Sequence, residues 1–184
     1  SKSFSKDLMK KYGIPTAGYE NFDDPQKALE YLHTQAKFPI VLKADGLALG
    51  KGVLICNTLE EAEAGVKEIM EDKKFGSAGN TMVIEEFMTG REVSVLSFVD
   101  GKTIRTMTSA QDHKRAMDGD KGLNTGGMGT FSPSPFYTEE VDEFCKKHIY
   151  QATVDAMAAE GRPFVGIIFF GLMLTADGPK VLEY

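Results

Sequence analysis

The sequence contains little of several residue types that would point to particular classes of protein. It has no Trp and only two Cys among 184 residues. Cys56 and Cys145 have neither a disulfide-type nor a zinc-type spacing, so we expect two reduced thiols in a cytoplasmic protein. No apolar run approaches the ~20 residues that a membrane-spanning helix needs. We therefore expect neither a membrane span nor a secretory signal.

An excess of basic residues is also missing. The chain has 21 Lys and Arg against 27 Asp and Glu, a formal net charge of −6. A nucleic-acid backbone favours a basic surface, so this balance argues against a nucleic-acid partner. The acidic balance does not exclude a small phosphorylated ligand, because a few suitably placed lysines and a metal ion are enough to bind its phosphates. A hydrophobic fraction of 42% is ample for a packed core.

The two ends of the sequence lack the usual signs of a natural start and finish. The chain begins Ser-Lys-Ser rather than with Met, and its last residues, 180–184, form an apolar run. We expect it to be part of a longer protein, with the rest of the parent chain as its natural partner.

Local patterns predict a mixed α+β fold with largely antiparallel strand pairing. Asp24-Pro25 and the capping-box pair Thr58 and Glu61 mark two helix starts, and Asp100-Gly101 suits a tight hairpin turn. Helices are expected over 3–12, 25–32, 58–70 and 138–160, and strands over 38–43, 53–56, 82–87, 92–99, 102–109, 164–174 and 180–184.

The segment from Lys43 to Gly52 is the first that carries chemistry. Its glycines let backbone N–H groups approach phosphate oxygens, and Lys43 and Lys51 add a charge at either end. It is not a P-loop, which would need Gly at position 45 and Ser or Thr at 52. A dinucleotide-binding loop would need Gly at position 55, where Ile stands. From these residues alone, the segment could also be an ordinary glycine-containing hairpin between two strands.

Three further segments carry polar groups in suggestive places. Glu85 and Glu86 end a predicted strand, where an adenine edge or a ribose could be held, although such an acidic pair is usually solvated. The glycine-rich loop 111–135 gathers cations, an imidazole and amides, which suits a small anionic substrate or a solvated basic cluster. Glu183 could coordinate Mg²⁺.

Taken together and in order, these segments resemble the ATP-grasp superfamily and, within it, the family of phosphoribosylamine–glycine ligases. The resemblance covers essentially the whole chain. The segments Gln111–Arg115 and Asn124–Gly129 are specific to this ligase family, whereas the lysine–glycine strand pair is shared more widely. The other matching segments are 1–4, 11–16, 43–48, 50–53, 85–87 and 118–120.

The resemblance implies a fold in which two lobes sandwich ATP. Residues 1–14 would be a helix of the large lobe, 15–84 the small lid lobe and 85–184 the large lobe, truncated at its C-terminus. Glu183 would bind Mg²⁺ (or Mn²⁺). The remaining nucleotide-binding residues would be Lys2, Lys43, Gly50, Lys51 and Gly52 at the phosphates and Glu85, Glu86, Phe87, Met88 and Glu92 at the adenosine.

The resemblance also implies a reaction, the ATP-dependent ligation of glycine to 5-phosphoribosylamine in purine biosynthesis. Catalysis would rest on Lys43 and, at the anionic substrate, on Asp112, Lys114, Arg115, Asn124, Thr125, Gly126 and Gly127; His113 is equally a substrate contact or loop structure. Two alternative interpretations remain: the chain could belong to another ATP-grasp ligase or carboxylase, or it could be an inactive nucleotide-binding fragment. The family's second metal ligand, an Asn, would follow Tyr184, so we expect this chain alone not to turn over.

Overall fold

The computed structural model describes residues 1–46, 52–119 and 121–184, and only the backbone of Leu123 and Asn124. The chain divides into two compact units. Unit 1 comprises residues 1–7 and 17–88, and unit 2 comprises residues 8–16 and 89–184. One division therefore falls inside the first helix, α1 (Lys2–Lys11). The assignment of residues 1–14, 15–84 and 85–184 to a lid lobe and a larger lobe stays a prediction.

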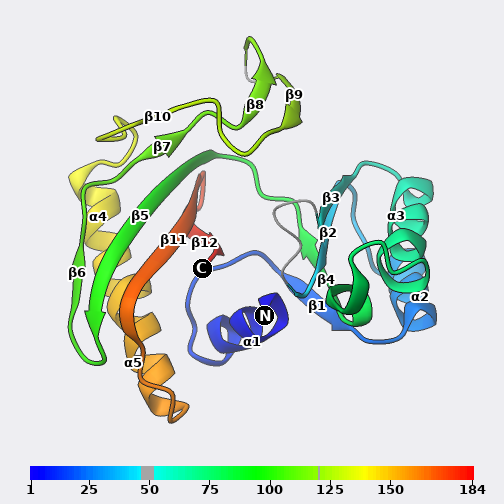
Figure 1. Ribbon diagram of the computed structural model, residues 1–184, viewed down its shortest axis with the longest axis horizontal. Coiled ribbons are helices and arrows are strands. Elements are labelled where there is room, and N and C mark those ends of the chain that lie inside the picture. Colours follow the sequence, from blue (N-terminus) through cyan, green and yellow to red (C-terminus); the bar gives the residue numbers. More distant parts are fainter. Residues whose placement is uncertain (47–51, 120) are drawn as a thin grey trace. The chain divides into compact units, whose positions relative to one another are not determined.

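Unit 1 is built on a four-stranded antiparallel sheet in the order β1-β4-β2-β3. The strands are β1 (Tyr19–Phe22), β4 (Met82–Glu86), β2 (Ile40–Ala44) and β3 (Val53–Cys56). Two helices, α2 (Pro25–Thr34) and α3 (Leu59–Val66), lie against one face of this sheet (Figure 1). A π-helical turn, η1 (Lys67–Glu71), extends α3, and a 3₁₀ turn, η2 (Gly76–Asn80), precedes β4.

Both predicted helix caps of unit 1 are present. The side chain of Asp24 accepts a hydrogen bond of 2.8 Å from Gln26 N, with Pro25 in the first turn of α2. The hydroxyl of Thr58 accepts one of 3.3 Å from Glu61 N at the start of α3. Each cap satisfies a backbone N–H that has no partner inside its helix.

The two faces of the unit 1 sheet differ in character because successive strand residues point to opposite sides. Ile40, Leu42 and Ala44 of β2, with Met82 and Ile84 of β4, pack into the hydrophobic core beneath α2 and α3. The alternate residues, which include Lys43 and Glu85, therefore lie on the other face, away from that core. This separation places the charged side chains on one side of a well-packed layer.

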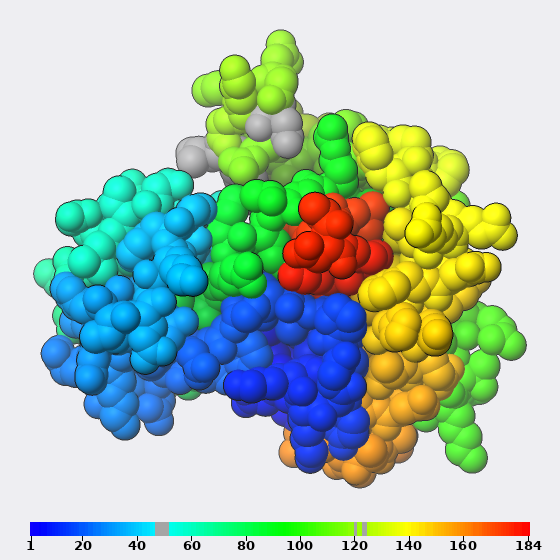
Figure 2. All heavy atoms as spheres, turned by 180° about the vertical axis from the view of Figure 1, so that it is seen from behind, coloured from blue at the N-terminus to red at the C-terminus, as the bar shows by residue number. Residues whose placement is uncertain are grey.

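Unit 2 is built on a second antiparallel sheet, in the order β12-β11-β5-β6. The strands are β5 (Arg91–Asp100), β6 (Ile104–Thr106), β11 (Val165–Thr175) and β12 (Gly178–Glu183). A long helical segment covers one face (Figure 1); it consists of α4 (Glu139–Cys145), the π-helical turn η3 (Lys146–Tyr150) and α5 (Gln151–Ala159). Figure 2 shows the red terminal strand beside these yellow and orange helices, to which Tyr184 is tied by a 2.9 Å hydrogen bond with Thr153.

The structure differs from the sequence prediction in several elements. Strand β1 was not expected, because its Tyr-Glu-Asn-Phe sequence has no buried alternation and pairs only with β4. The strand expected over 102–109 is shorter, and the helix expected over 138–160 contains η3. The loop 111–135 contains four short strands, β7 (Gln111–Asp112), β8 (Arg115–Met117), β9 (Lys121–Asn124) and β10 (Thr130–Phe131). In the described ranges, no helix is long and apolar enough to cross a membrane.

Candidate functional site

A buried cluster of three charged side chains lies on the face of the unit 1 sheet that points away from α2 and α3. The Nζ atom of Lys43 lies 3.0 Å from Oε2 of Glu85, and Nζ of Lys6 lies 3.3 Å from the same oxygen. The side chains of Lys6, Lys43 and Glu85 are 2%, 7% and 2% exposed. A buried charge is tolerated when it is paired, so one carboxylate holds two ammonium groups in place.

The strand register explains how this cluster forms. Glu85 of β4 stands opposite Val41 of β2, so Lys43 is its diagonal neighbour on the same face of the sheet. Lys6 comes from α1, where its Nζ also donates to the carbonyl of Ala17 at 3.3 Å. Burial, with the nearby charge of Lys43 adding to it, lowers the pKa of Lys6 to about 8, although the Glu85 carboxylate opposes this shift.

Lys2 and the loop after Lys43 form a second polar group in unit 1. Nζ of Lys2 donates to the carbonyls of Ala44 and Gly46 at 3.0 and 3.2 Å. Asp45 accepts a 2.6 Å hydrogen bond from Ser3 N at the start of α1. Burial alone would raise the pKa of Asp45, but the hydrogen bonds from Ser3 and Ser1 outweigh it and lower the pKa. Asp45 thus fixes the start of α1 against the loop.

The glycine-rich loop itself is described only at its ends. Gly46 lies so close to η2 that an added Cβ would approach Ala78 Cβ to 2.8 Å, so a side chain there would collide. Gly52 accepts a 2.8 Å hydrogen bond from Ala44 N, which continues the pairing of β2 with β3. Gly50 and Lys51, two of the expected phosphate contacts, lie outside the described residues.

The segment after β4 contains the residues expected at an adenine. Glu86 is exposed, and its carboxylate accepts a hydrogen bond of 3.3 Å from Gly18 N. Phe87 is half-buried, and Met88 is 8% exposed and belongs to the packed interior. Beyond Glu86 the segment is not a strand, so the backbone groups of Phe87 and Met88 take no part in the ladder of paired strands.

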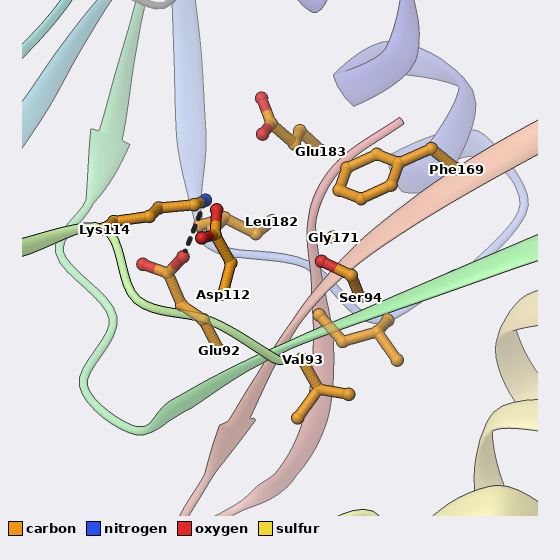
Figure 3. A pocket seen from close by; sticks show the side chains of 10 residues that line it. Glu92, Val93, Ser94, Asp112, Lys114, Phe169, Gly171, Leu182 and Glu183 are labelled. Carbon is orange, nitrogen blue, oxygen red and sulfur yellow. Dashed lines mark hydrogen bonds and ion pairs between the residues drawn. The ribbon is translucent and has the colours of Figure 1, made fainter. Parts of the chain in front are cut away.

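In unit 2, four of the predicted site residues line one small pocket (Figure 3). They are Glu92, Asp112, Lys114 and Glu183. Nζ of Lys114 lies 2.9 Å from Oε2 of Glu92, with the two side chains 33% and 43% exposed. Burial alone would lower the pKa of Lys114, but the hydrogen bond and charge of Glu92, helped by Glu183 and Asp112, raise it. The pocket therefore contains three carboxylates and one ammonium group.

Asp112 is held where a neighbouring chain segment approaches it closely. Gly127 has a φ of +117°, and a Cβ added to it would lie 3.0 Å from Oδ1 of Asp112. That oxygen is buried, and within the described residues no hydrogen-bond donor reaches it. A buried carboxylate oxygen without a donor is suited to receive a cation or a ligand N–H.

The two motifs specific to the resemblance lie side by side in unit 2. Met128 N donates to His113 O at 2.8 Å, and His113 N donates to Gly129 O at 2.9 Å. Thr125 binds the carbonyl of Lys114 through both its N–H, at 2.6 Å, and its hydroxyl, at 2.9 Å. Residues 113–115 of the first motif are therefore fixed by the second motif, whereas Gln111 and Asp112 pair with β10.

The remaining predicted residues of this loop have mixed positions. Arg115 donates at 2.8 Å to the carbonyl of Gly122, and its backbone pairs with that of Asn124. The side chain of Asn124 lies outside the described part of the chain. His113 is exposed, and its ring lies 5.3 Å from that of Phe131. Gly126 has no heavy atom within 4 Å of an added Cβ, in contrast to Gly127.

Glu183, the expected metal ligand, is exposed near the end of β12. Its backbone stands opposite Gly171 of β11, beside a register shift between Gly171 and Leu172. Figure 3 shows its carboxylate on the same side of the sheet as Asp112 and Lys114. Among the described residues, no group of three or more His, Cys, Asp or Glu side chains forms a ready metal site.

Lys6 belongs to the buried cluster, but sequence reasoning missed it. It follows Lys2 by four residues, so the two side chains lie on one face of α1. Lysine four residues after a predicted phosphate contact was a signal, but burial beside Glu85 depends on tertiary packing and cannot be read from a local pattern.

Comparison with known proteins gives concordant results. The profile of the family described as phosphoribosylglycinamide synthetase, ATP-grasp (A) domain, matches residues 1–184. A phosphoribosylamine–glycine ligase of Streptococcus pyogenes serotype M3 is 50% identical over all of this chain and 44% of its own length. The trifunctional purine biosynthetic protein adenosine-3 of Gallus gallus is 50% identical over all of this chain and 18% of its own length.

A solved structure agrees in both sequence and fold. The crystal structure of phosphoribosylamine–glycine ligase from Thermotoga maritima is 36% identical with a TM-score of 0.90, over all of this chain and 46% of that one. The chain thus spans less than half the length of these relatives. The predicted ATP-grasp fold is confirmed, and the chain belongs to the phosphoribosylglycinamide synthetase ATP-grasp (A) domain family.

Proposed function

We propose that the protein containing this chain joins glycine to 5-phosphoribosylamine at the expense of ATP, giving glycinamide ribonucleotide, ADP and phosphate. The observation that carries the proposal is the backbone pairing of residues 113–115 with residues 124–129, beside Glu92. These two segments distinguish this ligase family from other ATP-grasp enzymes, and their pairing supports a shared role at one substrate.

The nucleotide is assigned mainly to unit 1. Lys2 and Lys43, with Gly50, Lys51 and Gly52, contact the phosphates, while Glu85, Glu86, Phe87 and Met88 meet the adenine and Glu92 takes the ribose. The clustered lysines support this assignment, because preorganised cations stabilise phosphoryl charge in the transition state.

A divalent cation, Mg²⁺ or Mn²⁺, is assigned to Glu183. Mg²⁺ commonly takes one or two carboxylates together with substrate phosphates and water. Glu183 is an exposed carboxylate in a pocket that two other carboxylates line, and such oxygen donors suit this metal class. The cation neutralises phosphate charge when bound. Residues outside this chain complete its coordination.

The reaction needs positioning more than a protein nucleophile. The glycine carboxylate attacks the γ-phosphate of ATP, forming glycyl phosphate and releasing ADP. The amine of 5-phosphoribosylamine then attacks the acyl carbon and releases phosphate. Asp112, Lys114 and Arg115, with Asn124–Gly127, hold the anionic substrate, and the reactants gain from being oriented before reaction. A cytoplasmic location fits the purine pathway.

The test is an assay of the full-length parent enzyme. ADP release is expected to require both glycine and 5-phosphoribosylamine, and Lys43→Met is expected to reduce kcat/KM by about a hundredfold or more. Lys102→Met, a change at the β5–β6 turn, serves as the control with unchanged rates. ADP release that ignores glycine would contradict the proposal and favour another ATP-grasp ligase. The 184-residue chain alone is expected to bind ATP without turnover.

A further inference from the structure

In the buried cluster of unit 1, two lysines meet one carboxylate oxygen. Oε2 of Glu85 lies 3.0 Å from Nζ of Lys43 and 3.3 Å from Nζ of Lys6. A single ammonium group would be enough to pair a buried carboxylate. Two lysines crowd each other, which makes the arrangement costly unless one of them has a separate task.

The two lysines differ in what they can reach. Lys43 lies at the end of β2 that leads into the glycine-rich segment, one residue before the Ala44 carbonyl that accepts from Lys2. Lys6 is 2% exposed and also donates to the Ala17 carbonyl. Its Nζ lies 5.5 Å from the centre of the Tyr19 ring of β1. Lys6 is therefore enclosed by protein groups, whereas Lys43 is one of the residues assigned above to the phosphates.

We propose that Lys6 is a positioning residue: its ammonium group keeps the Glu85 carboxylate ionised and fixed while Lys43 directs its charge to a nucleotide phosphate. This inference rests on the proposed function of unit 1. If Lys43 were the only counter-ion of Glu85, reorienting its ammonium group to a phosphate would leave the buried Glu85 carboxylate unpaired, which is unfavourable. Lys6 removes that penalty, so Lys43 and Glu85 can serve phosphate and adenine at the same time.

The charged groups around Lys6 make the proposal sensitive to pH. Glu85 and Glu86 of β4 favour its protonated form, and burial and Lys43 of β2 disfavour it, which lowers its pKa to about 8. Tyr19 of β1 contributes its ring face. Loss of the proton removes the second counter-ion, so nucleotide affinity should fall as the pH rises through this range.

The experiment measures the Mg²⁺–ATP affinity of the full-length parent enzyme by calorimetry. Lys6→Met is expected to weaken binding about tenfold or more, and Lys6→Arg is expected to restore most of it because the guanidinium group keeps the charge. Lys10→Met, an exposed lysine of the same helix, is the control and should bind like the wild type. A Lys6→Met chain that melts at a lower temperature yet binds ATP normally would overturn the proposal.

Two further measurements separate positioning from folding. Between about pH 7.5 and about pH 9.5, wild-type affinity should fall more than that of Lys6→Arg, whose guanidinium group stays protonated. This comparison holds even if Lys6→Met does not fold. The losses caused by Lys6→Met and Glu85→Gln should not add, because Lys6 acts through Glu85. Parallel pH profiles or additive losses would overturn the proposal.

The wild type and Lys43→Met distinguish this inference from the proposed function. If Lys43→Met weakens ATP binding but Lys6→Met does not, only the role of Lys6 fails. If the wild-type full-length enzyme does not bind ATP, the nucleotide role of unit 1 fails and the proposal for Lys6 fails with it.

Discussion

Each of the two units contains an ion pair between a lysine and a glutamate. The N–O distance is nearly the same in the two pairs, but their burial differs. In unit 1, Lys43 lies 3.0 Å from Glu85 with both side chains almost fully buried. In unit 2, Lys114 lies 2.9 Å from Glu92 with both side chains at least one-third exposed. A half-exposed pair is screened by water, whereas a buried pair is costly to break because the remaining partner keeps an uncompensated charge. Distance alone therefore does not indicate what a pair contributes.

The two units also hold their predicted site residues by different means. Unit 1 relies on a buried charge cluster above a packed sheet. Unit 2 relies on backbone hydrogen bonds between Gln111–Arg115 and Asn124–Gly129, with Gly127 allowing the close approach to Asp112. Changes of charge should therefore disturb unit 1 most, and changes of backbone shape should disturb unit 2 most.

The largest expected effect is that of Glu85→Gln in unit 1. This change leaves two buried ammonium groups without their carboxylate, and we expect a loss of about 3–5 kcal/mol in the free energy of unfolding. Native-state hydrogen exchange of the β2 and β4 amides measures it for this unit. Glu86→Gln, the exposed neighbour, is the matched control and should cost little. Equal losses for the two variants would contradict the contrast between buried and exposed carboxylates.

The next largest effect is that of Gly127→Ala in unit 2. Ala at a φ of +117° is strained, and its Cβ would press on Oδ1 of Asp112. We expect a loss of about 1–3 kcal/mol, seen as faster exchange of the Thr125 and Met128 amides. Gly126→Ala is the control, because an added Cβ there meets no atom within 4 Å. If the two variants behave alike, backbone shape does not hold this site.

Sequence reasoning was most successful where a structural feature has a local cause. The caps at Asp24 and Thr58 and the turn at Asp100-Gly101 depend on neighbouring residues, and all are found in the structure. Pairing of the two motifs in loop 111–135 could not be predicted, because β8 and β9, with three and four residues, are too short to show a detectable periodicity. The role of Lys6 depends on its distance from Glu85, 79 positions later in the chain, which no local pattern encodes.

A smaller effect concerns the pH dependence of stability. The contributions of Lys6 and Lys114 to the free energy of unfolding change in opposite directions as the pH rises. The pKa of Lys6 is lowered to about 8 in the folded chain, so between about pH 8 and about pH 10.5 the unfolded chain binds more protons. The contribution of Lys6 to stability must therefore rise across this range. The pKa of Lys114 is raised, so its contribution is present below its unfolded value and is lost as the pH rises through the folded value.

The measurement is the difference in the free energy of unfolding between the wild type and Lys6→Met. This difference should change in favour of the wild type from about pH 8 to about pH 10, by on the order of 1 kcal/mol per pH unit. Lys10→Met is the control and should give a flat difference. A difference that moves against the wild type would mean that the pairing of Lys6 with Glu85 outweighs the cost of its burial.

The smallest expected effect is that of Glu92→Gln in unit 2. The change removes a half-exposed ion pair and leaves Lys114 partly hydrated, so we expect a loss of no more than about 1 kcal/mol. The loss should shrink further at high salt, because exposed charges are screened. Hydrogen exchange of the β5 amides at low and high salt measures both quantities. A loss comparable to that of Glu85→Gln would mean that Lys114 is held in place by Glu92 as firmly as Lys43 is by Glu85, and that exposure is a poor guide to the strength of such pairs in this fold.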